Sequence, residues 1–168
     1  VGGARQVGKT SLARFIGENH FPACQYLNWD YAPDRQSILQ YRFHGDAAIL
    51  LFDEIHKYKD WKNYLKGLFD KERETYRMLV TGSARLDLYR RGGDSLLGRY
   101  YYYRLHPFSV AEFLGRENNL VPGREISLVN TGADVAEAYD LLWTFGGFPE
   151  PLMKQSSRFL RRWRIQRH

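Results

Sequence analysis

The sequence predicts an α/β fold in which helices cover both faces of a parallel sheet, followed by a mainly helical C-terminal segment. Two continuous apolar runs, residues 47–52 and 76–81, are typical of strands that are buried on both faces. Amphipathic helical patterns alternate with these runs along the first two thirds of the chain. Alternation of strands and helices favours parallel pairing, because each helix carries the chain back across the sheet.

The elements of this sheet domain follow a regular order. Leu12, Phe15 and Ile16 recur at the spacing of a helix, and Asp60 precedes a second apolar periodicity as a candidate N-cap. The predicted elements are a helix over 8–18, strands over 25–28 and 47–52, a helix over 61–69, and strands over 76–81 and 100–105.

The pattern then changes. Ser109 and Glu112 form a capping box, and residues 116–133 are polar and rich in turn residues. Apolar residues at helical spacing over 135–143 predict a strong helix that ends at Gly146. The predicted domains are a core over 1–115, a linker over 116–133 and the start of a helical region over 134–168.

Composition excludes several classes of protein. The 168 residues are 43% hydrophobic and 26% charged, as in a globular domain and unlike a disordered or collagen-like chain. No apolar run spans a membrane, no leader opens the chain, and Cys24 is the only cysteine, so we expect a cytoplasmic protein without disulfides. The chain has no initiator Met and stops inside an amphipathic pattern, so we expect a fragment that lacks its first strand.

The net charge of +6 is concentrated at one end of the chain. Residues 154–168 hold six basic and no acidic residues, so the remainder carries 19 of each sign. A globally basic nucleic-acid-binding protein is therefore not supported. The basic end fits a solvated helix face better than a nucleic-acid contact, although a DNA or protein partner there stays open.

A glycine-rich loop opens the chain and has the spacing of a phosphate-binding loop. Gly3-Ala4-Arg5-Gln6-Val7-Gly8-Lys9-Thr10 matches Gly-x(4)-Gly-Lys-[Ser/Thr] immediately before the first predicted helix. Such a loop points its amides at phosphate oxygens, and the lysine and hydroxyl contact the phosphates and Mg²⁺. The predicted nucleotide-binding residues are Gly3, Ala4, Arg5, Gln6, Val7, Gly8, Lys9, Thr10 and Ser11.

Paired carboxylates end the buried strand at Asp53 and Glu54. Beside a phosphate loop, Asp53 is expected to hold Mg²⁺ together with Thr10, and Glu54 to act as the general base that activates water. The motifs Asp-x-x-Gly and Asn-Lys-x-Asp of GTPases are missing from the sequence, which favours ATP. The cofactors predicted are therefore ATP and Mg²⁺.

Further catalytic candidates follow the later strands. Ser83, or its neighbour Thr81, could orient water at the end of strand 76–81, although hydroxyls at such turns also bind backbone groups. Arg99 could reach the site of a neighbouring subunit in a homo-oligomer, or be a surface arginine. Arg85 and Arg5 are weaker candidates for that role.

Two other features have simpler interpretations. Tyr100-Tyr101-Tyr102-Tyr103 lies between arginines and could stack nucleic-acid bases, but tyrosine also favours strands, which is the interpretation we prefer. The five histidines show no spacing typical of metal ligands, so no metal is assigned to them.

The motifs together resemble a known group of proteins. The segments are Ala4-Arg5-Gln6-Val7-Gly8-Lys9-Thr10, Leu51-Phe52-Asp53-Glu54-Ile55-His56-Lys57, Thr81-Gly82-Ser83-Ala84 and Gly146-Gly147-Phe148-Pro149-Glu150. They are similar to prokaryotic AAA+-type ATPases in which a P-loop domain precedes a C-terminal domain of unknown function. The resemblance implies a three-layer P-loop core that binds and hydrolyses ATP, with Lys9, Thr10, Asp53 and Glu54 in the usual roles. It also implies a helical region downstream, and Ala4 stands where the family often has proline.

The sequence therefore predicts an ATPase that couples hydrolysis to an unknown partner. One alternative is a nucleotide-dependent DNA-binding module that uses the basic end and turns over little ATP. Another is a pseudo-ATPase scaffold, in which the loss of Lys9 would leave stability and partners unchanged.

Overall fold

The computed structural model describes residues 1–83, 96, 98–116 and 132–166, and the chain divides into two compact units, Val1–Leu105 and His106–His168. The elements of the first unit are β1 (Gly2–Gly3), α1 (Lys9–His20), β2 (Cys24–Asn28), α2 (Ala32–Leu39), β3 (Ile49–Asp53), the short 3₁₀ helix η1 (Ile55–Lys57), α3 (Trp61–Glu72), β4 (Arg77–Thr81) and β5 (Arg104–Leu105). The second unit holds α4 (Val110–Phe113), α5 (Ala133–Phe145), α6 (Pro149–Lys154) and α7 (Ser157–Gln166).

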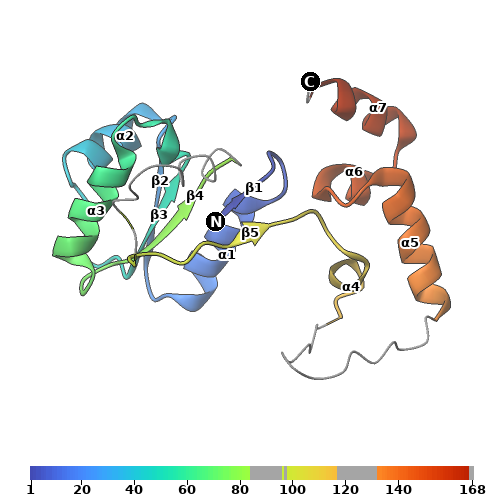
Figure 1. Ribbon diagram of the computed structural model, residues 1–168, viewed down its shortest axis with the longest axis horizontal. Helices are drawn as coiled ribbons and strands as arrows, with labels where there is room; N and C mark the ends of the chain where they lie inside the picture. The colour runs from blue at the N-terminus through green and yellow to red at the C-terminus, as the bar shows by residue number, and fades with distance from the viewer. Residues whose placement is uncertain (84–95, 97, 117–131, 167–168) are drawn as a thin grey trace. The chain divides into compact units, whose positions relative to one another are not determined.

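All strand pairs of the first unit are parallel, as predicted. Strands β2, β3 and β4 lie side by side in that order, and β1 pairs with β5 (Figure 1). Hydrogen bonds of Val1 and Gly2 join these two groups of strands. The Val1 nitrogen donates to the Val80 carbonyl, and the Val1 carbonyl accepts from the Gly82 nitrogen. The Gly2 nitrogen donates to the Tyr103 carbonyl. The strand that the sequence analysis found lacking is thus represented by Gly2–Gly3, between β4 and β5.

Helices pack against the sheet on both faces, which explains the continuous apolar sequence of β3. Leu50 and Phe52 belong to a core formed with residues of α2 and α3. On the opposite face Leu51 approaches Gly17 of α1, where an added Cβ would lie 2.9 Å from the Leu51 Cδ1. All five residues of β3 are buried, and this arrangement confirms the predicted three-layer α/β fold.

Two features of the first unit differ from the sequence prediction. Helix α2 was not predicted, because it lacks a helical apolar pattern and buries only Ile38. Of the strand predicted over 100–105, Arg104–Leu105 is a strand in the structure, paired with β1. Tyr101 and Tyr103 lie before this strand, and their side chains are largely exposed.

The second unit is helical, and its turns explain the glycine pair of the sequence. Helix α5 ends at Gly146, whose φ of 77° few other residues adopt readily. Gly147 accepts a hydrogen bond from the Phe108 nitrogen, and an added Cβ would lie 2.5 Å from the Phe108 oxygen. Ser109 and Glu112 form the predicted capping box at the start of α4. The predicted linker falls mainly on residues outside the described ranges.

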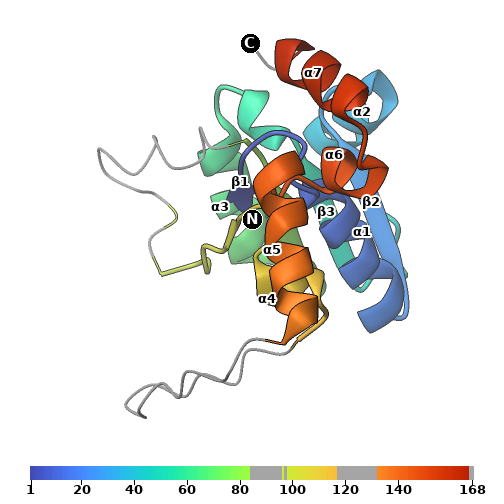
Figure 2. The ribbon, with the colours of Figure 1, turned by 90° about the vertical axis from the view of Figure 1, so that its right-hand side faces the viewer.

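Helix α7 carries the basic end of the chain, and it follows α5 and α6 (Figure 2). Leu160 and Trp163 are buried, and the Trp163 ring packs against Phe148 with centroids 5.1 Å apart. Arg161, Arg162 and other basic residues of this helix are exposed. The arrangement is that of an amphipathic helix with a solvated basic face.

Candidate functional site

The phosphate loop connects β1 to α1 through backbone conformations that favour a tight curve. Gln6 has a φ of 61° and Gly8 a φ of 101°, so the chain turns sharply before the helix begins at Lys9. Gly3 lies so close to the Leu105 carbonyl that an added Cβ would be 2.4 Å from its oxygen. The loop therefore ends at the first turn of α1, where unpaired amides favour an anion.

Replacement of Gly3 by alanine should destabilise the first unit. The Cβ would meet a backbone carbonyl that cannot rotate away, so we expect Gly3→Ala to lower the free energy of unfolding by roughly 1–3 kcal/mol in urea titrations. Gly67 in α3 is the matched control, because an added Cβ there meets no atom within 4 Å. Gly67→Ala should raise stability by about 0.5–1 kcal/mol. Equal stability of the two variants would contradict the close approach of Gly3 to β5.

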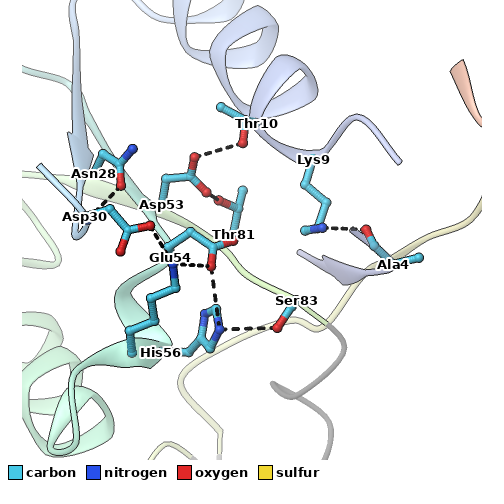
Figure 3. Close-up of polar contacts among 11 residues, drawn as sticks. Ala4, Lys9, Thr10, Asn28, Asp30, Asp53, Glu54, His56, Thr81 and Ser83 are labelled. Atoms are coloured by element: carbon cyan, nitrogen blue, oxygen red, sulfur yellow. Dashed lines mark hydrogen bonds and ion pairs between the residues drawn. The ribbon is translucent and has the colours of Figure 1, made fainter. Parts of the chain in front are cut away.

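Lys9 is the first residue of α1, and its side chain reaches back to the phosphate loop that precedes it. Its side chain is buried, and its ammonium group donates a hydrogen bond of 2.6 Å to the Ala4 carbonyl (Figure 3). Burial lowers the pKa of Lys9, whereas the carboxylates of Glu54 and Asp53 act in the opposite direction. A buried ammonium with a neutral carbonyl as its hydrogen-bond partner is suited to bind an anion.

Asp53 is the centre of a hydroxyl cluster at the end of β3. Its Oδ2 atom accepts a hydrogen bond of 2.8 Å from the Thr10 hydroxyl, and its Oδ1 accepts from Thr81 (Figure 3). The Oδ2 atom also accepts a hydrogen bond of 2.7 Å from the Tyr26 hydroxyl. Burial, together with the bond to Asp53, raises the pKa of Tyr26 to about 12. Residues from α1, β2, β3 and β4 thus hold one buried carboxylate in place.

Glu54 leaves the strand in a left-handed conformation, with a φ of 57°, and starts the turn into η1. Such a conformation is uncommon for a residue other than glycine and is often found at functional sites. Its Oε2 atom lies 3.4 Å from the Lys57 ammonium and 3.7 Å from the His56 Nε2 atom. Lys57 also bonds to Asp30 after β2, and this hydrogen bond raises the pKa of Lys57.

The two hydroxyl residues at the end of β4 have different partners. Thr81 donates to Asp53, whereas the Ser83 Oγ atom lies 3.2 Å from the His56 Nε2 atom. Ser83 therefore adjoins the Glu54 side of the site, and Thr81 adjoins the Asp53 side. The choice of Ser83 as the water-orienting residue stays a prediction.

Arg99 and Arg5 take no part in the hydrogen bonds described above. Arg99 forms an ion pair with Asp70 of α3, with 2.9 Å between its Nε and the carboxylate oxygen. Arg5 and Ser11 are exposed, in the loop and in the first turn of α1. Arg85 lies outside the described residues. Contact of Arg99 with a neighbouring subunit stays a prediction.

Four residues of the site were given no role by the sequence analysis: Tyr26, Asp30, His56 and Lys57. Tyr26 and Asp30 carry no motif, because their contacts depend on the pairing of β2 with β3. His56 and Lys57 belong to the segment 51–57 that carries the family resemblance. Their closeness to Glu54 in the sequence could therefore have identified them as residues of the site. Lys57 in particular stands three positions after Glu54, a spacing at which side chains on a helical turn are neighbours.

The residues present fit a magnesium–nucleotide complex. A Cβ at Gly3 would crowd the loop, the Lys9 ammonium is buried, and the hydroxyl of Thr10 meets the carboxylate of Asp53. Within the described parts of the chain, no group of three or more His, Cys, Asp or Glu residues could hold a metal alone. A magnesium ion here would therefore take further ligands from phosphate oxygens and water.

The parallel sheet, the loop and the acidic strand end define a P-loop nucleotide-binding core of the ATPase type. Comparison with protein families agrees: residues 1–114 match the family described as AAA domain, and the chain belongs to this family. This confirms the family to which the sequence analysis pointed.

Two curated relatives were found. One is an uncharacterized protein of Mycobacterium bovis and the other an uncharacterized protein of Mycobacterium tuberculosis. Each is 26% identical over 163 residues, which cover 96% of this chain and 32% of the relative. The chain thus spans about a third of the length of these relatives. Among the described residues, no helix is both long and apolar enough to cross a bilayer.

Proposed function

We propose that the first unit of this chain binds Mg·ATP and hydrolyses ATP, and that the whole protein couples hydrolysis to a partner. The observation that supports this most directly is the 2.8 Å hydrogen bond from Thr10 to Asp53. It brings the first turn after the phosphate loop to the acidic strand end, although the two residues are 43 positions apart in the sequence. A magnesium site in this class of protein needs both groups together.

Each site residue has a distinct task in this proposal. The backbone amides of residues 5–10 and the Lys9 ammonium bind phosphate oxygens, and Thr10 and Asp53 hold Mg²⁺. A bound magnesium ion stabilises negative charge on the phosphate oxygens. Lys9 contributes most when it is buried, because water then screens its charge less.

Glu54 acts on the attacking water. The water oxygen forms a bond to the γ-phosphorus while the bond from that phosphorus to the ADP oxygen breaks, and Glu54 accepts the proton from the water. The contacts of Lys57 and His56 both involve the Oε2 atom of Glu54. We assign the proton transfer to the other carboxylate oxygen, Oε1.

The proposal is tested by phosphate release over a range of Mg²⁺ concentrations. Asp53→Asn keeps the size of the side chain but removes the charge that three hydroxyls contact. We expect turnover to fall about 100-fold or more and the Mg²⁺ requirement to rise. Asp46→Asn, at an exposed position, is the matched control and should leave both unchanged. No magnesium-dependent turnover by the unsubstituted protein would refute the proposal.

A nucleotide-dependent DNA-binding module is the second candidate, because α7 exposes Arg161, Arg162 and Arg164 beside a buried Leu160 and Trp163. It predicts DNA binding that weakens steeply with salt and is lost in Arg161→Glu/Arg162→Glu, with little ATP turnover. A scaffold without turnover predicts that Lys9→Ala leaves partners as well as stability unchanged, and only the effect on partners distinguishes it from the ATPase. Magnesium-dependent phosphate release that is independent of α7 would favour the ATPase over both.

A further inference from the structure

His56 is a buried titratable residue to which the proposed reaction gives no task. Its side chain is only 8% exposed, and it lies in η1, directly beyond the acidic strand end. The Nε2 atom is 3.2 Å from the Ser83 Oγ and 3.7 Å from the Glu54 Oε2. The ring therefore stands between the end of β4 and the residue that follows β3 (Figure 3).

The two ring nitrogens of His56 have unequal surroundings. Within the described part of the chain, the buried Nδ1 atom has no hydrogen-bond partner. Nε2 faces two oxygens, a hydroxyl and a carboxylate, that can accept a hydrogen bond. A proton on Nδ1 would bury a donor without an acceptor and point the Nε2 lone pair at the Glu54 carboxylate. The geometry therefore favours the tautomer with its hydrogen on Nε2.

The surroundings of the His56 ring favour its neutral form. Burial lowers the pKa of His56, with Lys57 and Lys9 acting in the same direction, whereas Glu54 and Asp30 oppose the shift. A neutral ring has only one N–H group, which is within hydrogen-bond distance of the Ser83 hydroxyl, whereas the Glu54 Oε2 atom at 3.7 Å is a more distant electrostatic neighbour. Because the ring N–H serves as the donor, the Ser83 hydroxyl can direct its own hydrogen to another acceptor.

We propose that His56 is a positioning residue of this site: its Nε2–H group donates to the Ser83 hydroxyl and presents its positive end to the Glu54 carboxylate 3.7 Å away, and so favours one orientation of Glu54. The inference rests on the proposed function for the role of Glu54, but the hydrogen-bond arrangement is independent of it. Lys57 contacts the same carboxylate oxygen as His56. Together the two side chains restrain the Glu54 Oε2 atom. Because the carboxylate is rigid, this also sets the direction in which Oε1 points.

The first test reads the tautomer directly and needs no activity. Nitrogen-15 NMR of the ring nitrogens should show a neutral His56 with its proton on Nε2 near pH 7.5, and the signal is assigned by its loss in His56→Gln. Ser83→Ala should shift this signal, whereas Ser37→Ala, far along the chain in α2, should not. A proton on Nδ1, or a signal that does not respond to Ser83→Ala, would overturn the inference.

The second test separates positioning from packing by three substitutions of His56. Glutamine places an amide N–H near the position of Nε2, asparagine places one near Nδ1, and leucine fills space alone. We expect kcat to fall about ten- to a hundredfold in His56→Asn and His56→Leu, with the KM for ATP changed less than about twofold. His56→Gln should retain kcat to within about threefold.

The outcomes distinguish the inference from the proposed function. Equal loss in all three variants, or a loss that follows their melting temperatures, would show that His56 only fills space and would overturn the inference. Unchanged kcat in His56→Leu would overturn it as well. An unsubstituted protein without turnover would refute the proposed ATPase, and the tautomer and its response to Ser83→Ala would then still decide the hydrogen-bond arrangement.

Discussion

Lys9→Ala should abolish high-affinity binding of Mg·ATP and reduce kcat/KM by about 10³-fold or more. The ammonium group is buried and its hydrogen bond is to the neutral Ala4 carbonyl, so its charge is available to phosphate oxygens. In a site that excludes water, one such charge stabilises the transferred phosphoryl group by several kcal/mol. Calorimetric titration with ATP and phosphate-release assays measure the two effects.

The fold should survive this substitution. Alanine removes a buried charge whose pKa burial already lowers, and Ala4 keeps a carbonyl at the edge of the loop. We therefore expect a melting temperature within a few degrees of that of the unsubstituted protein. Lys59→Ala, at an exposed position, controls for loss of a positive charge in general. Tight ATP binding by Lys9→Ala would contradict the assignment of the loop.

Local sequence patterns predicted those parts of the fold that depend on near neighbours in the chain. The phosphate loop and α1 form one continuous segment. The apolar run of β3, which ends at Asp53, is typical of a strand that is buried on both faces. The capping box at Ser109 is likewise contained within four residues. In each case the residues that make the contact are also close in sequence.

The surroundings of Asp53 could be predicted only in part, because they depend on strand register. Thr81 stands beside Asp53 in the parallel ladder, while Tyr26 lies two residues before Asn28, the partner of Asp53 on the other side. A shift of one residue in either pairing would turn these hydroxyls to the other face of the sheet. Strand register depends on how the whole sheet packs, and a local sequence pattern does not carry that information.

The two errors of the fold prediction also have physical causes. Helix α2 begins with Pro33 in its first turn but has no apolar periodicity, since it contributes little beyond Ile38 to the core. The predicted strand over 100–105 has the β propensity of four tyrosines, yet propensity cannot form a strand without a partner. In the structure Arg104 and Leu105 have such partners in Gly2 and Gly3.

Glu54→Gln should separate ATP binding from ATP hydrolysis. Glutamine has nearly the same shape, so the left-handed turn at this position and the neighbouring loop should persist. An amide cannot accept a proton from water, and loss of a general base typically costs 10²- to 10⁴-fold in rate. We therefore expect kcat to fall by about that factor, measured as phosphate released per mole of protein at saturating Mg·ATP.

The affinity of Glu54→Gln for Mg·ATP should rise or stay the same, although its turnover falls. The Glu54 carboxylate opposes an incoming polyphosphate, and its charge acts on Lys9 strongly enough to influence the pKa of that ammonium. Without this negative charge, Lys9 and Lys57 both present more net positive potential to the nucleotide. The dissociation constant for Mg·ATP should therefore remain equal or decrease by a few-fold.

A matched control exists in Glu74, an exposed glutamate that pairs with Arg73 beyond the end of α3. Glu74→Gln removes the same charge from the protein as a whole and should change neither kcat nor affinity. If Glu54→Gln kept more than about a third of the turnover, another group would have to accept the proton, and Glu54 would serve only to balance Lys57. If it lost ATP binding along with turnover, its carboxylate would belong to the magnesium site rather than to the attacking water.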